Sequence, residues 1–339
     1  MNCLFAYRKP ESSIIQAASS HRFIQGLHPG CFSIGAFDRN PHSLISIPAD
    51  KPVEVSEINR FIVDNKLKEN VECVNKLYSF PSISTSRTEH TENVINIIDE
   101  IKKGNIQKCV STRAIIRNLK IDVAATFIKL CETYPNAFVF LFDTPLSGTW
   151  IGASPELLLS RKDSEVTTMS LAGTKPSDSQ NIWTQKEYYE QQIVTDFLKN
   201  ILEQHAIKIR CEGPYTKVAG PVEHLMTIIR GDINSDIDIN KLLNQIYPTP
   251  ALAGFPREKS LKLIKSIEKF ERGYYGGFCG WIENNNDFDL YVNLRSMLVN
   301  SDRYCIFAGG GIVEDSLPEN EWQETENKSE TLTKVITFA

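Results

Sequence analysis

The sequence has no C-x-x-C pair, although it contains eight cysteines. They are scattered, several within apolar runs, at Cys3, Cys31, Cys73, Cys109, Cys131, Cys211, Cys279 and Cys305. Free cysteines are among the most buried residue types, and disulfides are rare in a reducing cytosol, so we expect buried free thiols. The six histidines are also dispersed, and none stands near cysteines at zinc spacing. This pattern argues against a disulfide-stabilised scaffold and against a structural zinc site.

Long apolar runs and blocks of like charge are missing as well. No run approaches the length that spans a bilayer, and the first ten residues lack the apolar stretch of a secretion signal. The formal net charge of -5 is spread along the chain, which gives no footprint for nucleic acid or an anionic membrane. We therefore expect a cytoplasmic protein with a small-molecule partner and neither nucleic acid nor membrane as partner. We expect a monomer, with a dimer as the alternative.

Fixed-period repeats and low-complexity tracts are absent, which argues against a solenoid. Of the 339 residues, 41% are apolar, enough for a large core. Apolar spacing and end signals predict helices from residue 91 to about 103 and over 123–133, 184–205 and 256–270. Strand-like runs cover 108–116, 137–142, 156–160, 165–171, 278–282, 288–299 and 304–307. Because strands come in runs broken by helices without strict alternation, the predicted fold class is α+β.

Residues 308–328 combine three consecutive glycines with a strongly acidic helix signal after Pro318. On a helix, Glu321, Glu324 and Lys328 share one face, which alone is typical of a solvated surface. The glycines at 309–311 could form a nest of backbone N–H groups that holds an anion, or simply a tight turn. Together these features predict a site for an anionic ligand held through a metal.

A second acidic helix presents Glu187 and Glu190 three residues apart. Two helices that each offer glutamates can hold Mg²⁺, which prefers oxygen ligands and often bridges to an anionic substrate. Magnesium is therefore the expected metal.

Four further residues are candidates for chemistry. Lys108 and Glu156 each stand at the start of an apolar strand, where burial can make a lysine a base and a glutamate an acid. The alternatives are a lysine at a strand edge and a glutamate in a turn. Arg295 lies among apolar residues of a predicted strand and is either a paired core ion or a carboxylate clamp. His224 alone is most simply a hydrogen-bonded structural histidine.

Taken together and in order, these segments resemble the chorismate-utilising enzymes, a family that includes isochorismate, salicylate, anthranilate and aminodeoxychorismate synthases. The segments include Gly152-Ala-Ser-Pro-Glu156 and Leu171-Ala-Gly-Thr174. The full set is residues 106–113, 152–156, 171–174, 187–194, 224–225, 247–256, 270–277, 294–296 and 308–328. The resemblance implies a single domain over residues 1–339, with two large, mostly antiparallel sheets flanked by helices and the active site between them. Residues 1–90 would be a shorter N-terminal part of this fold, and 91–339 would carry the motifs.

The resemblance also bears on the reaction. Family members with a lysine nucleophile carry it where this chain has Ala172, and water-adding members carry a lysine where this chain has Lys108. Salicylate synthases share that lysine, but residues 250–256 are more similar to isochorismate synthases of the menaquinone or siderophore type. The resemblance therefore implies an isomerase that converts chorismate to isochorismate. The alternatives are a salicylate synthase and a non-catalytic chorismate-binding protein.

The resemblance assigns roles residue by residue. Glu190 and Glu324 would hold Mg²⁺, and Glu187 and Glu321 would orient its waters. Lys108 would activate water, Glu156 would protonate the leaving hydroxyl, and His224 would lie near the reacting centre. The substrate would contact Gly173, Thr174, Ala251, Leu252, Arg295, Gly309, Gly311 and Lys328.

Three positions depart from the family pattern. Tyr247 and Gln191 stand where histidine is common, and residues 175–177 replace a more basic run. None of these changes removes a proposed ligand or catalyst.

Overall fold

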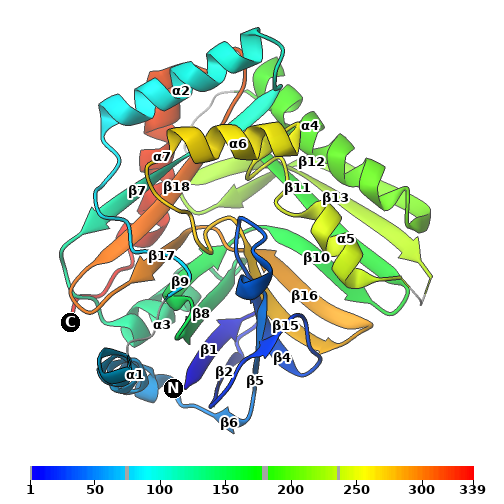
Figure 1. The fold of residues 1–339 in the computed structure, drawn as a ribbon. Coiled ribbons are helices and arrows are strands. Elements are labelled where there is room, and N and C mark those ends of the chain that lie inside the picture. The colour runs from blue at the N-terminus through cyan, green and yellow to red at the C-terminus, as the bar shows by residue number, and fades with distance from the viewer. Residues whose placement is uncertain (1, 73–75, 178–181, 235–236) are drawn as a thin grey trace.

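The computed structural model describes residues 2–72, 76–177, 182–234 and 237–339. Two nine-stranded sheets form its centre, and helices lie around them (Figure 1). Every strand pairing within the described residues is antiparallel. The predicted α+β class with two mostly antiparallel sheets is confirmed.

The first sheet, sheet A, is ordered β14-β7-β18-β17-β9-β8-β1-β2-β6. Its strands are β14 (Gly254–Phe255), β7 (Lys108–Arg117), β18 (Tyr304–Ile312), β17 (Ser296–Val299), β9 (Gly148–Ser154), β8 (Phe138–Thr144), β1 (Cys3–Arg8), β2 (Ile15–Ser20) and β6 (Lys51–Pro52).

The second sheet, sheet B, is ordered β12-β13-β11-β10-β16-β15-β4-β5-β3. Its strands are β12 (Ala206–Ala219), β13 (Val222–Ile233), β11 (Glu165–Pro176), β10 (Leu157–Lys162), β16 (Asp287–Val292), β15 (Phe278–Asn284), β4 (Cys31–Gly35), β5 (Ile45–Pro48) and β3 (Ile24–Gln25).

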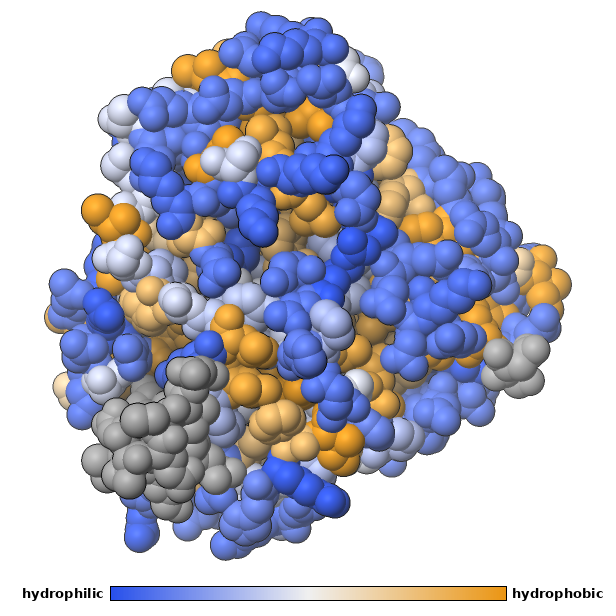
Figure 2. Space-filling model, viewed as in Figure 1, coloured by the Kyte–Doolittle hydropathy of each residue, from blue (hydrophilic) through white to orange (hydrophobic). Residues whose placement is uncertain are grey.

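Seven α-helices lie in the described residues, and most pack on the outside of the sheets. They are α1 (Ile58–Glu72), α2 (Arg87–Lys102), α3 (Val123–Thr133), α4 (Gln185–Leu202), α5 (Ile239–Ile246), α6 (Arg257–Ile267) and α7 (Pro318–Thr333). Helix α4 covers β11 and β13 of sheet B, whereas α2 and α7 lie together over β7 and β18 of sheet A (Figure 1). Figure 2 shows hydrophobic side chains gathered in small groups between elements on this face.

Aromatic side chains join the inner faces of the two sheets. Phe5 of sheet A stacks on Phe32 of sheet B with ring centroids 5.0 Å apart. Phe138 of sheet A stacks on Tyr291 of sheet B at 4.1 Å. Such buried pairs bury large apolar area, so this aromatic cluster fixes how the sheets face each other.

The N-terminal strands are integral to both sheets. Strand β1 pairs with β8 in sheet A, and β4 pairs with β15 in sheet B. Residues 3–52 therefore pack as part of the same two-sheet body.

The helix predictions agree with the structure to within a few residues. Helix α4 begins after Thr184, whose side chain caps it together with the side chain of Glu187, and this capping box explains the clear start signal. The long hairpin β12–β13 and helix α5 had no strong periodic signal and were not predicted.

Two predictions in the C-terminal region are wrong. The glycines at 309–311 form neither a nest nor a turn, because β18 runs through them and pairs with Val110–Thr112 of β7. Arg295 is not inside a strand. The predicted strand over 288–299 is divided into β16 and β17, and Arg295 lies in the connection that passes from sheet B to sheet A.

The seven described cysteines form no disulfide, and five of them are buried, whereas Cys73 lies outside the described residues. In the described part of the chain, none of the helices has the length and apolar character to cross a membrane.

The residues at all three departures from the family pattern make structural contacts. Tyr247 is buried edge-on against Phe278. The Gln191 amide donates to the Ser170 carbonyl and hydroxyl, which ties α4 to β11. In the segment 175–177, Lys175 Nζ lies 3.2 Å from Glu223 Oε2 and 4.8 Å from the centre of the Trp183 ring.

Candidate active site

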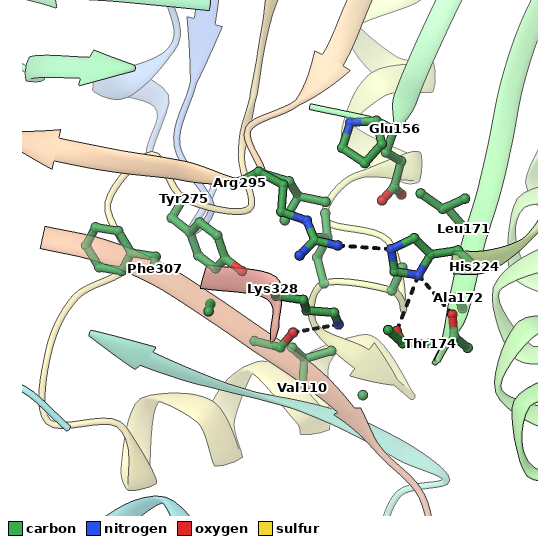
Figure 3. A pocket seen from close by; sticks show the side chains of 18 of the residues that line it. Val110, Glu156, Leu171, Ala172, Thr174, His224, Tyr275, Arg295, Phe307 and Lys328 are labelled. Carbon is green, nitrogen blue, oxygen red and sulfur yellow. Dashed lines mark hydrogen bonds between the residues drawn. The ribbon is translucent and has the colours of Figure 1, made fainter. Parts of the chain in front are cut away.

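A cavity of about 60 Å³ lies between the two sheets, and predicted site residues form most of its polar wall (Figure 3). Eleven of them line it: Glu156, Gly173, Thr174, Glu190, His224, Ala251, Leu252, Arg295, Gly309, Gly311 and Lys328. Lys108 lies behind the wall, and Glu187, Glu321 and Glu324 line a neighbouring cleft that shares Thr174 with the cavity. The fold thus brings residues from distant segments to one place.

Two connections between the sheets position the key charged side chains. The chain leaves sheet A after β9 and enters sheet B at β10, and Glu156 lies in this short connection. The chain returns between β16 and β17, where Arg295 has a φ of 48°. A non-glycine residue in this left-handed region is uncommon and is often retained at functional sites.

Glu156 is almost fully buried, and its Oε1 has no hydrogen-bond partner. Burial raises the pKa of Glu156 from 4.5 to about 8, although Lys108, Lys328 and Arg295 oppose the shift. Desolvation disfavours the charged form of a carboxyl group. At neutral pH Glu156 is therefore mainly protonated and can donate a proton.

His224 holds Arg295 in place. Its Nδ1 lies 2.9 Å from the Gly173 carbonyl oxygen, which can only accept, so Nδ1 carries the proton. The Nε2 atom is then free to accept from Arg295 Nη2 at 3.0 Å (Figure 3). Burial and the nearby Arg295 charge lower the pKa of His224 well below its usual value, which keeps the ring neutral. The histidine is thus set to position the guanidinium.

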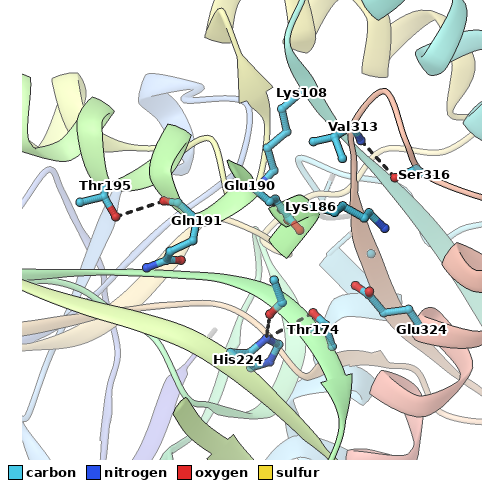
Figure 4. A network of polar contacts seen from close by, with 12 residues as sticks. Lys108, Thr174, Lys186, Glu190, Gln191, Thr195, His224, Val313, Ser316 and Glu324 are labelled. Atoms are coloured by element: carbon cyan, nitrogen blue, oxygen red, sulfur yellow. Dashed lines mark hydrogen bonds and ion pairs between the residues drawn. The ribbon is translucent and has the colours of Figure 1, made fainter. Parts of the chain in front are cut away.

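Lys108, at the start of β7, forms a buried ion pair with Glu190 of α4. Its Nζ lies 2.9 Å from Glu190 Oε1 (Figure 4). Lys108 is first among the causes that lower the pKa of Glu190 against the opposing effect of burial. This contact needs Gly311, because a Cβ there would lie 2.2 Å from Glu190 Oε1 and 2.9 Å from Lys108 Cε.

Helix α7 brings two more glutamates, one paired with a lysine of α7 and the other with a lysine of α4. Lys328 Nζ lies 2.5 Å from Glu324 Oε1 and donates to the Gly309 carbonyl. Lys186 of α4 lies 2.8 Å from Glu321 Oε1. Figure 4 shows Lys108, Lys186, Glu190 and Glu324 around one small volume between α4 and α7.

The three lysine-paired carboxylates, Glu190, Glu321 and Glu324, are the side chains here that could hold a divalent cation. Glu321 is 1% exposed, and its Oε2 has no hydrogen-bond partner. Burial, followed by the charge of Glu324, raises the pKa of Glu321 to about 7. Carboxylate oxygens are ligands that suit a hard divalent cation, and here each of the three carboxylates is paired with a lysine. No three His, Cys, Asp or Glu side chains in the described ranges are already gathered as a ligand set. The ion pairs with lysine hold these carboxylates instead.

Glu187 has another partner. Its Oε2 accepts from the backbone N–H of Thr184 at 2.8 Å and from the Thr184 hydroxyl, which caps α4. Its predicted role beside a metal stays a prediction.

The sequence analysis missed two residues of this site. Tyr275 lines the cavity beside Arg295 and is buried, and Lys186 pairs with Glu321. Tyr275 belongs to the segment 270–277 already singled out, whereas Lys186 directly precedes Glu187. In sequence, a tyrosine among apolar residues and a lysine on an acidic helix are ordinary, so only the packing distinguishes them.

The fold and this cavity, with its acid, its cations and its carboxylate cluster, define an enzyme class that acts on a small anionic substrate. The family model described as chorismate binding enzyme matches residues 51–337. The chain therefore belongs to the chorismate-binding enzyme family.

Individual relatives agree with this assignment. The chain is 28% identical over 324 residues to the vibriobactin-specific isochorismate synthase of Vibrio cholerae, covering 90% of this chain and 78% of that protein. It is 31% identical over 242 residues to isochorismate synthase MenF of Bacillus subtilis, covering 68% of this chain and 51% of that protein. The chain thus spans about half the length of the second relative.

A solved structure shows the same fold. The menaquinone-specific isochorismate synthase MenF from Escherichia coli superimposes with a TM-score of 0.78 at 21% identity, covering 98% of this chain and 88% of that one. The predicted family and fold are confirmed.

Proposed function

We propose that this protein is an isochorismate synthase that converts chorismate to isochorismate with Mg²⁺. The observation that carries the proposal is the buried Glu156, whose pKa burial raises to about 8, in the cavity that also contains Arg295 and Lys328. Two of its relatives carry this activity in their names. The names include a vibriobactin-specific and a menaquinone-specific enzyme, so the product would enter a siderophore or a menaquinone pathway.

The reaction needs a base and an acid at two places on the ring. Lys108, as a neutral amine, would take a proton from water while the water oxygen bonds to C2. The ring double bond shifts, and the C4–O bond breaks as Glu156 donates its proton, so the C4 hydroxyl leaves as water. One water is consumed and one is released, which makes the overall step an isomerisation. Ala172 leaves no lysine amine to compete with the water.

Arg295 and Lys328 would hold the two carboxylates of chorismate. Arg295 Nη1 is buried without a partner, so a carboxylate oxygen would satisfy it. Since His224 fixes the other terminal nitrogen, the guanidinium is oriented before the substrate arrives.

The carboxylates that would hold Mg²⁺ are Glu190 and Glu324, with Glu321 behind them. A bound Mg²⁺ would supply positive charge to the ring carboxylate of chorismate. Lys108 is paired with Glu190, and a paired ammonium cannot accept a proton. Lys108 would therefore have to separate from Glu190 and give up a proton before it serves as a base.

Substrate binding requires the cavity to open. Its volume of about 60 Å³ is well below the about 300–1,000 Å³ of usual ligand sites. The neighbouring cleft of about 660 Å³ contains Lys186, Glu321 and Glu324, so separation of the ion pairs would join the two spaces.

A product assay tests the proposal. Pure protein incubated with chorismate and Mg²⁺ should form isochorismate, and a chelator should abolish turnover until Mg²⁺ is restored. Salicylate with pyruvate would instead identify a salicylate synthase, since that class shares Lys108. Tight chorismate binding with no product would identify a non-catalytic chorismate-binding protein. Lys108→Ala should be inactive yet folded, with the exposed Lys102→Ala as the matched control.

The seven described cysteines without a disulfide are consistent with a reducing compartment, and we propose that the enzyme acts in the cytoplasm.

A further inference from the structure

A second cleft, of about 480 Å³, shares Arg295 with the catalytic cavity. Arg295 and Pro155 line both spaces. The rest of its wall comes from the turn of the β12–β13 hairpin at residues 217–221, from residues 133–137 after α3, and from Thr331 and Lys334 at the end of α7. We call this space the Lys217 cleft.

The wall of the Lys217 cleft is positively charged. It contains Lys217, Arg295 and Lys334, and none of the described residues that line it is an aspartate or glutamate. Lys334 is neutralised by Glu330 at 2.6 Å. Lys217 forms no ion pair with any described residue, and burial lowers its pKa although Glu11 opposes the shift. Two cationic side chains thus face the cleft without a compensating carboxylate in its wall.

Two side chains of the wall each have one buried polar atom without a hydrogen-bond partner. Arg295 is 8% exposed with Nη1 unpaired, and Thr331 is 3% exposed with Oγ1 unpaired. Such groups cost free energy unless a ligand or water satisfies them. A guanidinium nitrogen donates only, whereas a hydroxyl can donate or accept, so an anion would satisfy both.

Lys217 is also linked to the catalytic residues. It stands directly opposite His224 in the β12–β13 ladder, and paired residues project from the same face of a sheet. His224 in turn accepts from Arg295.

Much of the remaining wall is apolar. Ala153, Pro155, Val218 and Pro221 contribute small aliphatic surface, and the ring of Tyr134 adds an aromatic one. An inorganic anion would leave this surface in contact with water, whereas an organic acid would cover it.

We propose that the Lys217 cleft binds an organic monocarboxylate with a compact apolar body, whose carboxylate lies between Lys217 and Arg295. The occupant and the chorismate carboxylate would both use Nη1 of Arg295, so the two compete for it. The occupant therefore draws the guanidinium away from the substrate carboxylate and inhibits turnover. The binding site is independent of the proposed function, and only the inhibition rests on it.

Benzoate is a suitable probe, and calorimetry measures its binding without turnover. Benzoate should bind the wild-type protein, and Lys217→Met should weaken its affinity at least tenfold. Lys208→Met, an exposed lysine on the same strand and outside the cleft, should bind like wild type. Lys328→Met separates this cleft from the catalytic cavity, because Lys328 lines only the latter. A tenfold loss in Lys328→Met with none in Lys217→Met would overturn the proposal.

Two further experiments use inorganic phosphate as a competitor and measure inhibition of turnover by benzoate. Phosphate that displaces benzoate and loses affinity in Lys217→Met would show that the occupant is an inorganic anion, which contradicts the organic acid. In the turnover assay, benzoate should raise the apparent KM for chorismate in the wild type and in Lys208→Met. In Lys217→Met, the same rise in KM should need at least a tenfold higher benzoate concentration. Without benzoate, the rate of Lys217→Met should stay within twofold of wild type. If the protein turned over no chorismate, the calorimetric result would still decide the binding site.

Discussion

At the residue scale, burial gives ordinary side chains their chemistry. Glu156 follows a proline in a short connection, where a glutamate is usually exposed and ionised. Here it is buried among apolar and cationic groups, and the balance of burial against the nearby positive charges leaves its pKa at about 8. Desolvation outweighs the attraction of three cations, and that makes Glu156 an acid at neutral pH.

The pH dependence of turnover follows from this shift. Because the folded-state pKa lies above the usual 4.5, Glu156 keeps its proton at neutral pH and loses it as the pH rises through about 8. We expect kcat/KM to fall above pH 8. Glu156→Gln should lower kcat by about 10²- to 10⁴-fold and remove this alkaline decline. A steady-state pH series on both proteins measures it, and an unchanged alkaline limb in the variant would assign the titration to another group.

His224 should affect substrate binding more than the chemical step. Replacing it with leucine leaves Arg295 Nη2 without its acceptor, and a lost hydrogen bond to a charged group costs about 1.5–3 kcal/mol. We expect His224→Leu to raise KM for chorismate by about 10- to 100-fold. In His224→Gln the amide oxygen can accept from Arg295, so this variant should recover most of the loss. Equal kcat losses in both variants would instead indicate proton transfer by the histidine.

At the scale of elements, the site depends on how closely strand β18 approaches helices α4 and α7. The three glycines of β18 present no side chains, and at Gly310 and Gly311 glutamates from the helices occupy the space that Cβ atoms would fill. A Cβ at Gly310 would lie 3.1 Å from Glu321 Oε2, and one at Gly311 would lie 2.2 Å from Glu190 Oε1. The glycines therefore allow strand β18 to pack closely against helices α4 and α7.

This packing predicts a graded effect of alanine along β18. Gly311→Ala must displace Glu190, whereas Gly310→Ala needs a shift of only a few tenths of an ångström. A misplacement of about 1 Å in an active site can cost on the order of 100-fold in rate, so we expect that loss for Gly311→Ala and a smaller one for Gly310→Ala. Turnover and Mg²⁺ titration of both variants measure the order, with circular dichroism as the check on folding. The reverse order would show that the Glu190 contact is not needed.

At the scale of the whole molecule, a buried ion pair connects the site to the surrounding body. Arg272 donates to the carbonyls of Val110 and Leu252 and pairs with Glu268, whose carboxylate accepts from the N–H of Thr112. Val110 and Leu252 line the catalytic cavity. The Arg272–Glu268 ion pair therefore holds in place the part of the cavity wall that these two residues form.

Breaking this pair should destabilise the fold. Arg272→Met leaves the Glu268 carboxylate buried and unpaired, which usually costs about 3–5 kcal/mol. Urea unfolding at neutral pH should show that loss. The double variant Arg272→Met with Glu268→Gln should recover part of it, because no buried charge remains. Equal stability of the single and double variants would mean that the charge of Glu268 is not the cause.

Local patterns in the sequence determined the helices and the family. Thr184 and Glu187 mark the start of α4 through a capping box, and the spacing of Glu321, Glu324 and Lys328 places them on one face of α7. The ordered segments from residue 106 to 328 were enough to identify a chorismate-binding enzyme and most of its cavity. These features depend on neighbours within a few residues, and a sequence displays such neighbours directly.

Only the tertiary structure decided how those residues are paired and protonated. The pairs Lys108–Glu190, Lys186–Glu321 and Arg295–His224 each join segments more than 70 residues apart. The strand through Gly309–Gly311 and the passage of Arg295 between the sheets also depend on distant partners. Burial and the field of neighbouring charges are properties of the folded chain, so the pKa of Glu156, the neutral ring of His224 and the charge of the Lys217 cleft could not be predicted from the sequence.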